Sequence, residues 1–203
     1  MRIPKHIGII PDGNRRWAVD NGLNKEDGYS YGLKPGVELL RIAREYGVEE
    51  LTYYGFTVDN CKRPVEQVKA FSKACVDAVK MIENEETNLY VVGNFNSKCF
   101  PKELLPYTKY DRDRDKRENE MYINFLVNYG WEWDMKNNWQ SRNIPRVDLV
   151  IRWGGMRRLS GLLPLQTVYS DICIIDELWP DFTKEQFDRA IEWYQKQDIT
   201  LGG

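Results

Sequence analysis

The stretch His6-Ile-Gly-Ile-Ile-Pro-Asp-Gly-Asn-Arg-Arg-Trp17 gives the strongest indication of the fold. An apolar run ends in Asp12-Gly13-Asn14, and two arginines follow at once. This order is typical of a buried strand that leads into the first turn of a helix. There a glycine lets the backbone approach a ligand, and unpaired N–H groups face an anion. The stretch predicts a strand followed by an anion-binding turn.

Asp12 is the carboxylate of this turn. A carboxylate among phosphate-binding groups is explained by a cation between it and the phosphate, and Mg²⁺ prefers such oxygen ligands. The alternative is an ordinary turn, in which Asp12 or Asn14 caps the helix and Arg15 and Arg16 are solvated. The stretch alone fits both interpretations.

Length and composition limit the class of protein. A chain of 203 residues, 42% of them hydrophobic, predicts one compact domain over residues 1–203. The net charge of -2 argues against a general nucleic-acid binder. We expect a cytoplasmic protein with at most peripheral membrane contact, because no run approaches ~18 apolar residues. The four cysteines are far apart and accompanied by one histidine, which predicts reduced thiols: Cys61, Cys75, Cys99 and Cys173.

Six short apolar runs predict strands, most of them covered on both faces: Ile7–Ile10, Leu51–Phe56, Leu89–Val92, Tyr122–Val127, Val147–Ile151 and Ile172–Ile175. Helical patterns separate several of them. One spans Leu33 to Ala43, a longer one spans Val65 to Ile82, and a third begins at Thr183, which forms a capping-box pattern with Gln186. This alternation predicts an α/β fold with a mostly parallel sheet.

Two segments do not follow the alternation. Charges of opposite sign alternate from Asp111 to Glu118, which is typical of a solvated helix face or loop, and we assign no chemistry to them. The aromatic segment from Trp131 to Trp139 fits either a short helix over a pocket mouth or ordinary surface packing.

A second polar cluster, Thr57-Val-Asp-Asn-Cys-Lys-Arg-Pro64, follows the strand that ends at Phe56. Ligands of α/β sheets bind at the carboxyl ends of strands, so this loop and the Asp12 turn are expected to face one crevice. The alternative role of Thr57, Asp59 and Asn60 is turn and capping chemistry.

A third cluster follows the strand that begins at Val147. Arg152 ends that strand, Gly154-Gly155 turns the chain, and Arg157, Arg158 and Ser160 come next. Arginines beside a glycine pair indicate a second anion site, of the size of a diphosphate. Asp171 is the acidic residue after this cluster and is a candidate metal ligand together with Asp12.

Together these clusters resemble the cis-prenyltransferase family, which includes the undecaprenyl diphosphate synthases. The resemblance covers nearly the whole chain and rests on these stretches: His6 to Trp17, Phe56 to Pro64, Asn128-Tyr-Gly with Trp133-Asp134, Ile151-Arg-Trp-Gly-Gly-Met-Arg-Arg-Leu-Ser160, and Leu178-Trp-Pro-Asp-Phe182 with the terminal Gly202-Gly203.

The resemblance implies a six-stranded, mostly parallel sheet flanked by helices, a hydrophobic tunnel for a prenyl chain, and a homodimer. It implies that Asp12 binds Mg²⁺ and that Asp12, Arg16 and Asn60 act in catalysis, Asn60 as a weak proton acceptor. The allylic diphosphate would contact Gly13, Asn14, Arg15, Arg16, Lys25, Thr57, Asn60 and Arg63. The homoallylic diphosphate would contact Arg152, Arg158 and Ser160, and Trp17 would line the apolar side together with the helix from Val65 to Ile82.

The sequence also departs from the family pattern. Tyr29 stands in Gly28-Tyr-Ser-Tyr-Gly32 where the long-chain synthases usually have a histidine, Met156 follows Gly154-Gly155 in place of glutamate, Asp171 replaces a metal-binding glutamate, and Thr200 replaces a terminal arginine. The segment between Trp133-Asp134 and Val147 is also short. In these departures the sequence resembles short members of the family that join two five-carbon units head to middle, the lavandulyl and cyclolavandulyl diphosphate synthases.

The expected function is therefore to ionise an allylic diphosphate, dimethylallyl or geranyl, and to join it to a second isoprenoid diphosphate, with a preference for the irregular reaction. Three alternatives stay open. One is a regular short-chain cis synthase that uses isopentenyl diphosphate. Another is a non-catalytic partner subunit of an active homologue. The third is a relative that captures the allylic cation with water or another acceptor.

Overall fold

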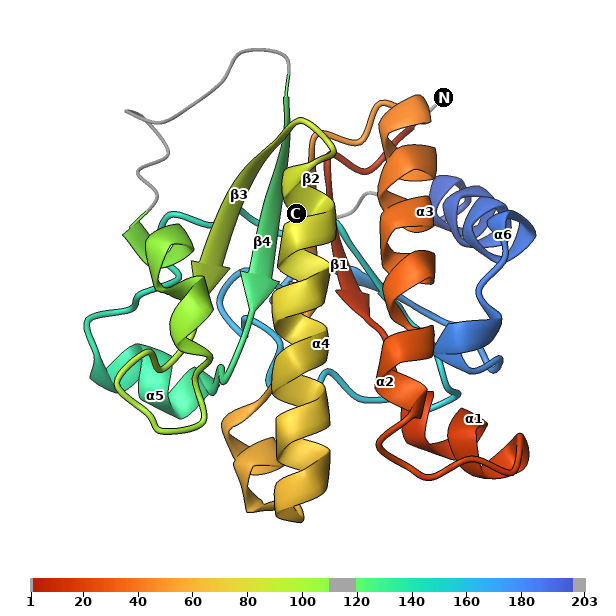
Figure 1. Cartoon of the computed structure of the whole chain (residues 1–203). Coiled ribbons are helices and arrows are strands. Elements are labelled where there is room, and N and C mark those ends of the chain that lie inside the picture. The colour runs from red at the N-terminus through yellow and green to blue at the C-terminus, as the bar shows by residue number, and fades with distance from the viewer. Residues whose placement is uncertain (1, 110–119, 199–203) are drawn as a thin grey trace.

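One parallel sheet of six strands forms the centre of the computed structural model, which describes residues 2–109 and 120–198 (Figure 1). The strand order is β3-β4-β2-β1-β5-β6, and every neighbouring pair is parallel. The strands are β1 His6–Ile10, β2 Glu50–Tyr54, β3 Thr87–Val92, β4 Met121–Leu126, β5 Leu149–Arg152 and β6 Asp171–Ile174. The predicted α/β class and the six strands are confirmed, and the sheet is wholly rather than mostly parallel.

Helices lie between the strands in the chain. They are α1 Asn14–Asp20, α2 Gly28–Tyr31, α3 Leu33–Glu45, α4 Val65–Glu83, α5 Trp131–Lys136 and α6 Lys184–Gln195, with 3₁₀ turns η1 Val58–Lys62, η2 Lys102–Lys109 and η3 Trp179–Asp181. Figure 1 shows α3 and α4 side by side across the sheet, with α6 beyond α3 and with α1 and α5 toward the arrowheads of the strands.

The alternation of side chains along the strands divides the core between the two faces of the sheet. Ile7, Leu51 and Ile123 belong to the larger cluster, which also contains residues of α3, α4 and α6. Tyr54 and Val150 point to the opposite face, where a smaller cluster includes Leu162 and Leu163. Both faces of the central strands are covered, which explains why these runs are apolar at nearly every position.

The three predicted helices begin where the sequence patterns placed them, at Leu33, Val65 and after Thr183. The Thr183 N–H donates to Gln186 Oε1 at 3.2 Å, and the capping box at the start of α6 is complete. The segment from Trp131 forms a short helix, as one of its two interpretations predicted. The predicted strand from Leu51 ends two residues early, at Tyr54, because the N–H groups of Gly55 and Phe56 both donate to Leu126 O. The alternating charges from Asp111 to Glu118, Thr200 and the terminal glycines lie outside the described residues.

A polar network is buried at the amino ends of the central strands. The His6 ring hydrogen-bonds through Nε2 to Thr52 Oγ1 at 2.8 Å and through Nδ1 to Arg146 O at 3.1 Å. Asn124 Nδ2 donates to Thr52 Oγ1 at 3.0 Å and to Glu50 Oε1 at 2.6 Å. Burial lowers the pKa of His6 from its ordinary value of 6.5, and the nearby charge of Glu50 opposes this effect.

Candidate active site

A cavity of about 1450 Å³ opens at the carboxyl ends of the strands. Its mouth is polar and its far part is apolar. The apolar part runs along one face of α4, whose lining residues are spaced by three or four positions: Phe71, Ala74, Cys75, Ala78 and Ile82. Val37 of α3 and Phe125 of β4 line the same region. The cavity therefore combines a polar mouth, lined by several arginines, with an apolar arm between helices and sheet.

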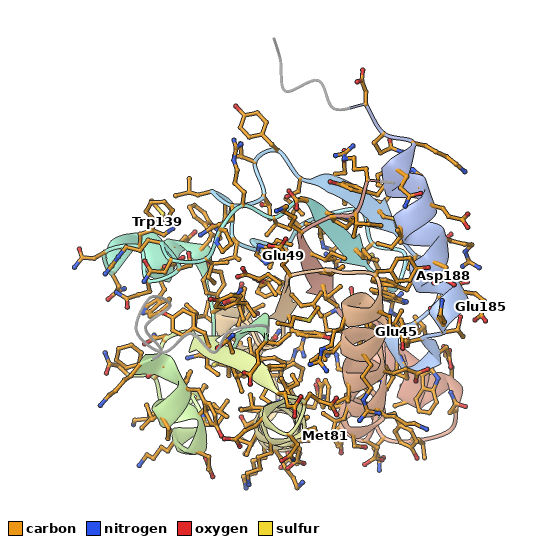
Figure 2. All side chains as sticks on the ribbon, turned by 90° about the horizontal axis from the view of Figure 1, so that it is seen from above. Glu45, Glu49, Met81, Trp139, Glu185 and Asp188 are labelled. Carbon is orange, nitrogen blue, oxygen red and sulfur yellow. The ribbon has the colours of Figure 1, made fainter. Side chains whose placement is uncertain are left out.

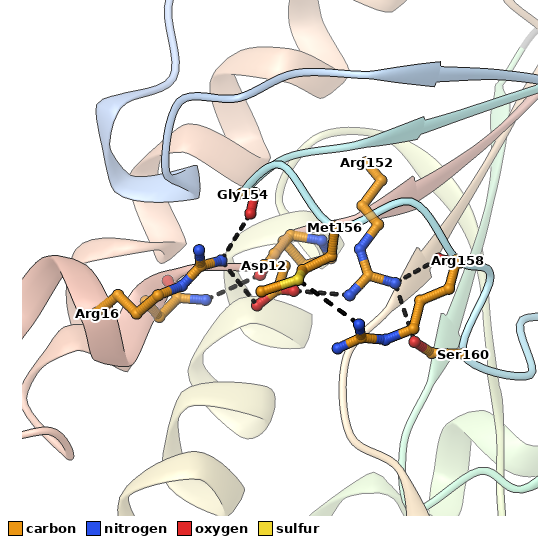
Figure 3. A network of polar contacts seen from close by, with 9 residues as sticks. Asp12, Arg16, Arg152, Gly154, Met156, Arg158 and Ser160 are labelled. Atoms are coloured by element: carbon orange, nitrogen blue, oxygen red, sulfur yellow. Dashed lines mark hydrogen bonds and ion pairs between the residues drawn. The ribbon is translucent and has the colours of Figure 1, made fainter.

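Asp12 and Arg152 form an ion pair across the mouth of the cavity. Arg152 Nη2 donates to Asp12 Oδ2 at 2.7 Å, which joins the second residue after β1 to the last residue of β5 (Figure 3). Arg16, one turn along from Asp12, lies with Nη2 3.7 Å from Asp12 Oδ1 and donates to Gly154 O at 2.9 Å. Two guanidinium groups thus flank one carboxylate at this point.

Arg152 is held from its other side by the loop that follows β5. Its Nη1 donates to Ser160 Oγ at 2.9 Å and also to Arg158 O. The Arg152 side chain is only 5% exposed. A buried cation needs such partners, because its desolvation otherwise costs more than the ion pair returns. The Arg158 side chain is exposed and approaches the Met156 sulfur, Nη1 to Sδ, at 3.6 Å (Figure 3).

Two glycines allow the segments at the mouth to come together. Gly13 has a φ of 109°, and a Cβ built there would lie 2.8 Å from Leu178 Cδ2. Gly154 has a φ of 84°, and a Cβ there would lie 2.4 Å from Arg16 Nη2. Any other residue would therefore be strained at both positions and would also collide with a neighbour.

The segment Leu178-Trp-Pro-Asp-Phe182 supports the Asp12 turn from behind. The Trp179 N–H donates to Asp12 O at 3.0 Å, and its Nε1 donates to Gly32 O at 2.9 Å. The Trp179 ring packs edge-on against Trp153 with 4.8 Å between centroids. This segment fixes the Asp12 backbone, a role that sequence reasoning did not assign to it.

The loop after β2 carries a second capping box. The Thr57 N–H donates to Asn60 Oδ1 at 3.0 Å, and the Thr57 side chain accepts from the Asn60 backbone. Asn60 Oδ1 thus accepts one hydrogen bond from the protein and keeps a second lone pair, so its role as a weak proton acceptor stays a prediction. Its Nδ2 has no protein partner in the described part of the chain and is the group left to donate to a ligand.

Tyr29 lies where the polar mouth meets the apolar arm. Arg63 Nη1 donates to the Tyr29 hydroxyl oxygen at 3.0 Å, and the ring meets Phe71 edge-on at 4.5 Å. Burial raises the pKa of Tyr29, and the charges of Arg63 and Arg15 oppose this effect. The group is a neutral phenol at neutral pH, unlike the histidine that it replaces in the family pattern.

Most of the predicted site residues line this one cavity: Asp12, Gly13, Asn14, Arg15, Arg16, Lys25, Tyr29, Thr57, Asn60, Arg63, Arg152, Arg158 and Ser160. Two predicted residues do not. Asp171 is the first residue of β6, at the amino edge of the sheet, and pairs with Arg2 at 3.4 Å. Asp12 lies at the other ends of the strands, the carboxyl ends. The prediction that Asp171 and Asp12 of the same chain share a metal ion is therefore wrong.

Trp17 is the second correction. Its Nε1 donates to Asp181 Oδ1 at 2.7 Å and its ring stacks at 4.6 Å on Tyr31, outside the cavity lining. Trp131 and Trp133 line the cavity, as one of the two interpretations of their segment predicted, and Met156 lines it too, whereas Tyr53 and Tyr54 were missed as lining residues. Tyr54 was detectable in principle, since it ends the strand before a predicted ligand loop.

The donor set at the mouth fits Mg²⁺ only together with a substrate. Among residues 2–109 and 120–198, no group of three or more His, Cys, Asp or Glu side chains is placed to hold a metal ion. Mg²⁺ is commonly bound by one or two carboxylates plus substrate phosphates and waters. Asp12, whose side chain is 34% exposed at the cavity mouth, can supply the single protein ligand of such a site.

Fold and site together define an α/β protein in which several arginines line the polar mouth of a partly apolar cavity. Comparison with known proteins assigns the family. A protein-family model described as "Putative undecaprenyl diphosphate synthase" matches residues 10–143 and 135–202. The chain belongs to this family, whose members are prenyltransferases.

Similar sequences extend over the whole chain. An isoprenyl transferase of Fusobacterium nucleatum is 33% identical over 227 residues, covering 99% of this chain and 96% of the relative. A geranylgeranyl-diphosphate-specific tritrans,polycis-undecaprenyl-diphosphate synthase of Aeropyrum pernix is 32% identical over the full length of both chains.

A solved structure shares the fold. Lavandulyl diphosphate synthase from Lavandula x intermedia, in complex with dimethylallyl diphosphate, superposes with a TM-score of 0.82 at 20% identity and covers 98% of each chain. No helix in the described part of this chain is both long and apolar enough to cross a membrane.

Proposed function

We propose that this prenyltransferase ionises an allylic diphosphate and joins it to a second isoprenoid diphosphate held at Arg152, Arg158 and Ser160. The observation that carries the proposal is the single cavity, in which the cationic mouth opens directly into the apolar arm along α4. An amphiphile with a diphosphate head and a hydrocarbon tail matches both parts at once.

The chemistry requires stabilisation of a leaving group more than it requires a base. Departure of diphosphate from an allylic carbon leaves a delocalised cation. The positive groups Arg15, Arg16 and Arg63 line the cavity and would stabilise the negative charge of the departing diphosphate. Mg²⁺ bound at Asp12 would supply further charge neutralisation to the diphosphate. The arginines after β5 would hold the second substrate in register, which removes an entropic cost from the coupling.

The irregular head-to-middle reaction is our preferred form, with dimethylallyl diphosphate as both donor and acceptor. Tyr29 and Met156 support it, because both alter the surroundings of the diphosphates relative to the family pattern that serves isopentenyl diphosphate. Homodimer formation also remains a prediction.

Regular elongation is the second candidate, and the length of the cavity favours it. From Phe71 to Ile82 the lining face of α4 spans ~16 Å at the usual helical rise. This is several times the length of one five-carbon unit. Such an arm suits an allylic substrate or product longer than dimethylallyl.

One experiment separates these possibilities. Purified protein is incubated with dimethylallyl diphosphate and Mg²⁺, with and without isopentenyl diphosphate, and the products are identified by mass spectrometry. A ten-carbon diphosphate from dimethylallyl diphosphate alone supports irregular coupling, whereas product only with both substrates supports elongation. An alcohol indicates capture by water. Absence of any product, with geranyl and farnesyl diphosphates also tested, would contradict catalysis and favour a partner subunit.

A further inference from the structure

An apolar surface lies beside the cavity mouth and is not covered by any described residue. It consists of Trp131, Met135, Trp139 and Leu165, which are 47%, 49%, 37% and 44% exposed. These four side chains line a shallow, almost wholly apolar groove of about 150 Å³, and we call them the Trp139 patch. Figure 2 shows Trp139 at the outer margin of the molecule, and it lies in the turn that follows α5.

The patch coincides with a place where the chain is shorter than its relatives. The two matches to the family model overlap at residues 135–143, and the alignments with relatives run over 227 and 231 positions against 203 residues in this chain. The relatives therefore contain residues that this chain lacks. The match to the family model is divided within the segment that carries Met135 and Trp139, so this segment differs from the family pattern at the patch.

The exposed charges of the segment 131–146, which carries most of the patch, are mostly positive. Lys136, Arg142 and Arg146 are exposed, whereas Glu132 is the exposed acidic residue of this segment. Asp134 is buried and accepts hydrogen bonds from Tyr129 and Ser141 at 2.8 and 2.6 Å, so its charge is directed inward. The Arg146 guanidinium lies 4.4 Å above the ring of Tyr169, which is itself 56% exposed.

We propose that the Trp139 patch docks on a lipid bilayer that contains anionic headgroups. Tryptophan and tyrosine favour the headgroup level of a bilayer, and flanking lysines and arginines are attracted to anionic lipids. A second copy of the chain fits less well, because a two-fold contact through this patch would bring the same positive side chains together. Trp131 lines both the patch and the cavity, so docking places the cavity mouth next to the lipid.

Vesicle binding tests the apolar part of the proposal without substrate, so its outcome does not depend on the proposed activity. The protein is sedimented with vesicles of phosphatidylcholine alone and of phosphatidylcholine with phosphatidylglycerol in a three-to-one ratio. We expect binding to the mixed vesicles, and a loss of at least tenfold in M135Q/W139Q. The control is M81Q, since Met81 is similarly exposed at 36% but lies on α4, away from Trp139 (Figure 2).

A second variant tests the charges, with its melting temperature measured as well because Arg142 Nη1 donates to Asn138 O and the Arg146 guanidinium packs on the Tyr169 ring. In R142Q/R146Q, each cation removed is expected to weaken binding to the mixed vesicles about fivefold. Added salt should also weaken the binding of the wild-type protein, because it screens the same charges. Met135 and Trp139 do not line the cavity, so the activity of M135Q/W139Q on soluble substrates should be unchanged.

Three results would overturn the proposal. These are absence of binding to the mixed vesicles, equal binding by wild type and M135Q/W139Q with an unaltered melting temperature, and dimers in light scattering that M135Q/W139Q converts to monomers. The last result would assign the patch to a second copy of the chain.

Discussion

Arg152 Nη2 donates to Asp12 Oδ2 at 2.7 Å, so residues 140 positions apart in the chain share one ion pair at the cavity mouth. The pair joins two neighbouring strands, β1 and β5, at their carboxyl ends. Since Asp12 is the proposed metal ligand and Arg152 belongs to the second anion site, the contact also joins the two proposed diphosphate sites.

Asp12→Ala is expected to lower turnover about 100-fold or more, because it removes the carboxylate at the departing diphosphate. It should also lower the free energy of unfolding by about 1–3 kcal/mol, since the buried Arg152 loses its ion pair. Steady-state kinetics and thermal unfolding measure the two effects. Asp171→Asn is the control and should leave turnover unchanged; a comparable loss there would restore the metal role that its position argues against.

Arg158→Ala should raise the KM for the second diphosphate substrate about tenfold with a smaller effect on kcat, because a charge-assisted contact to that substrate is lost. Arg157→Ala is the matched control, since Arg157 is exposed but does not line the cavity. Equal KM values for the two variants would mean that the second substrate binds elsewhere.

Asn60→Asp and Asn60→Ala distinguish a ligand contact from a capping role. Aspartate keeps the oxygen that accepts the Thr57 N–H, whereas alanine removes it and should cost about 1 kcal/mol of stability. If the Nδ2 group donates to a diphosphate, both variants lose at least about tenfold in kcat/KM. Wild-type kinetics in Asn60→Asp would show that the residue only caps the loop.

Gly13→Ala and Gly22→Ala separate backbone strain from steric collision. Both glycines have a positive φ, 109° and 72°, but a Cβ at Gly22 meets nothing within 4 Å. Gly22→Ala should cost about 1–2 kcal/mol from strain alone. Gly13→Ala should cost about 1–3 kcal/mol more, because its Cβ collides with Leu178. Chemical denaturation measures both, and equal losses would argue against close packing at the Asp12 turn.

His6 predicts a pH dependence of stability. Its pKa in the folded protein lies below 6.5, so the unfolded chain binds a proton first as the pH falls through 6.5. Stability is therefore retained above that pH and lost below it, with a slope of up to about 1.4 kcal/mol per pH unit. His6 is the one histidine of the chain, so His6→Gln should reduce this slope. An unchanged profile in denaturation experiments would assign the slope to carboxylates.

The sequence was a good guide where function depends on short segments. Asp12 and Gly13 follow a strand and Arg152 ends one, and the rule that ligands bind at carboxyl ends predicted that they lie together. The same rule argues against Asp171, which begins its strand instead of ending or following it. Trp17 was misplaced because its position depends on Asp181, 164 residues away, and no local pattern encodes that contact. The support of Asp12 by Trp179 was missed for the same reason.

The central place of β1 in the sheet has a consequence for biosynthesis. β1 is made before the other five strands of the sheet and lies between β2 and β5, so it lacks one neighbour until residues 149–152 have left the ribosome. No amino-terminal fragment that ends before Arg152 contains both members of the Asp12–Arg152 pair. During most of translation, one side of β1 therefore has backbone N–H and C=O groups without a neighbouring strand. Such long-range pairing is characteristic of slow folding, and the exposed strand is prone to aggregation that chaperones prevent.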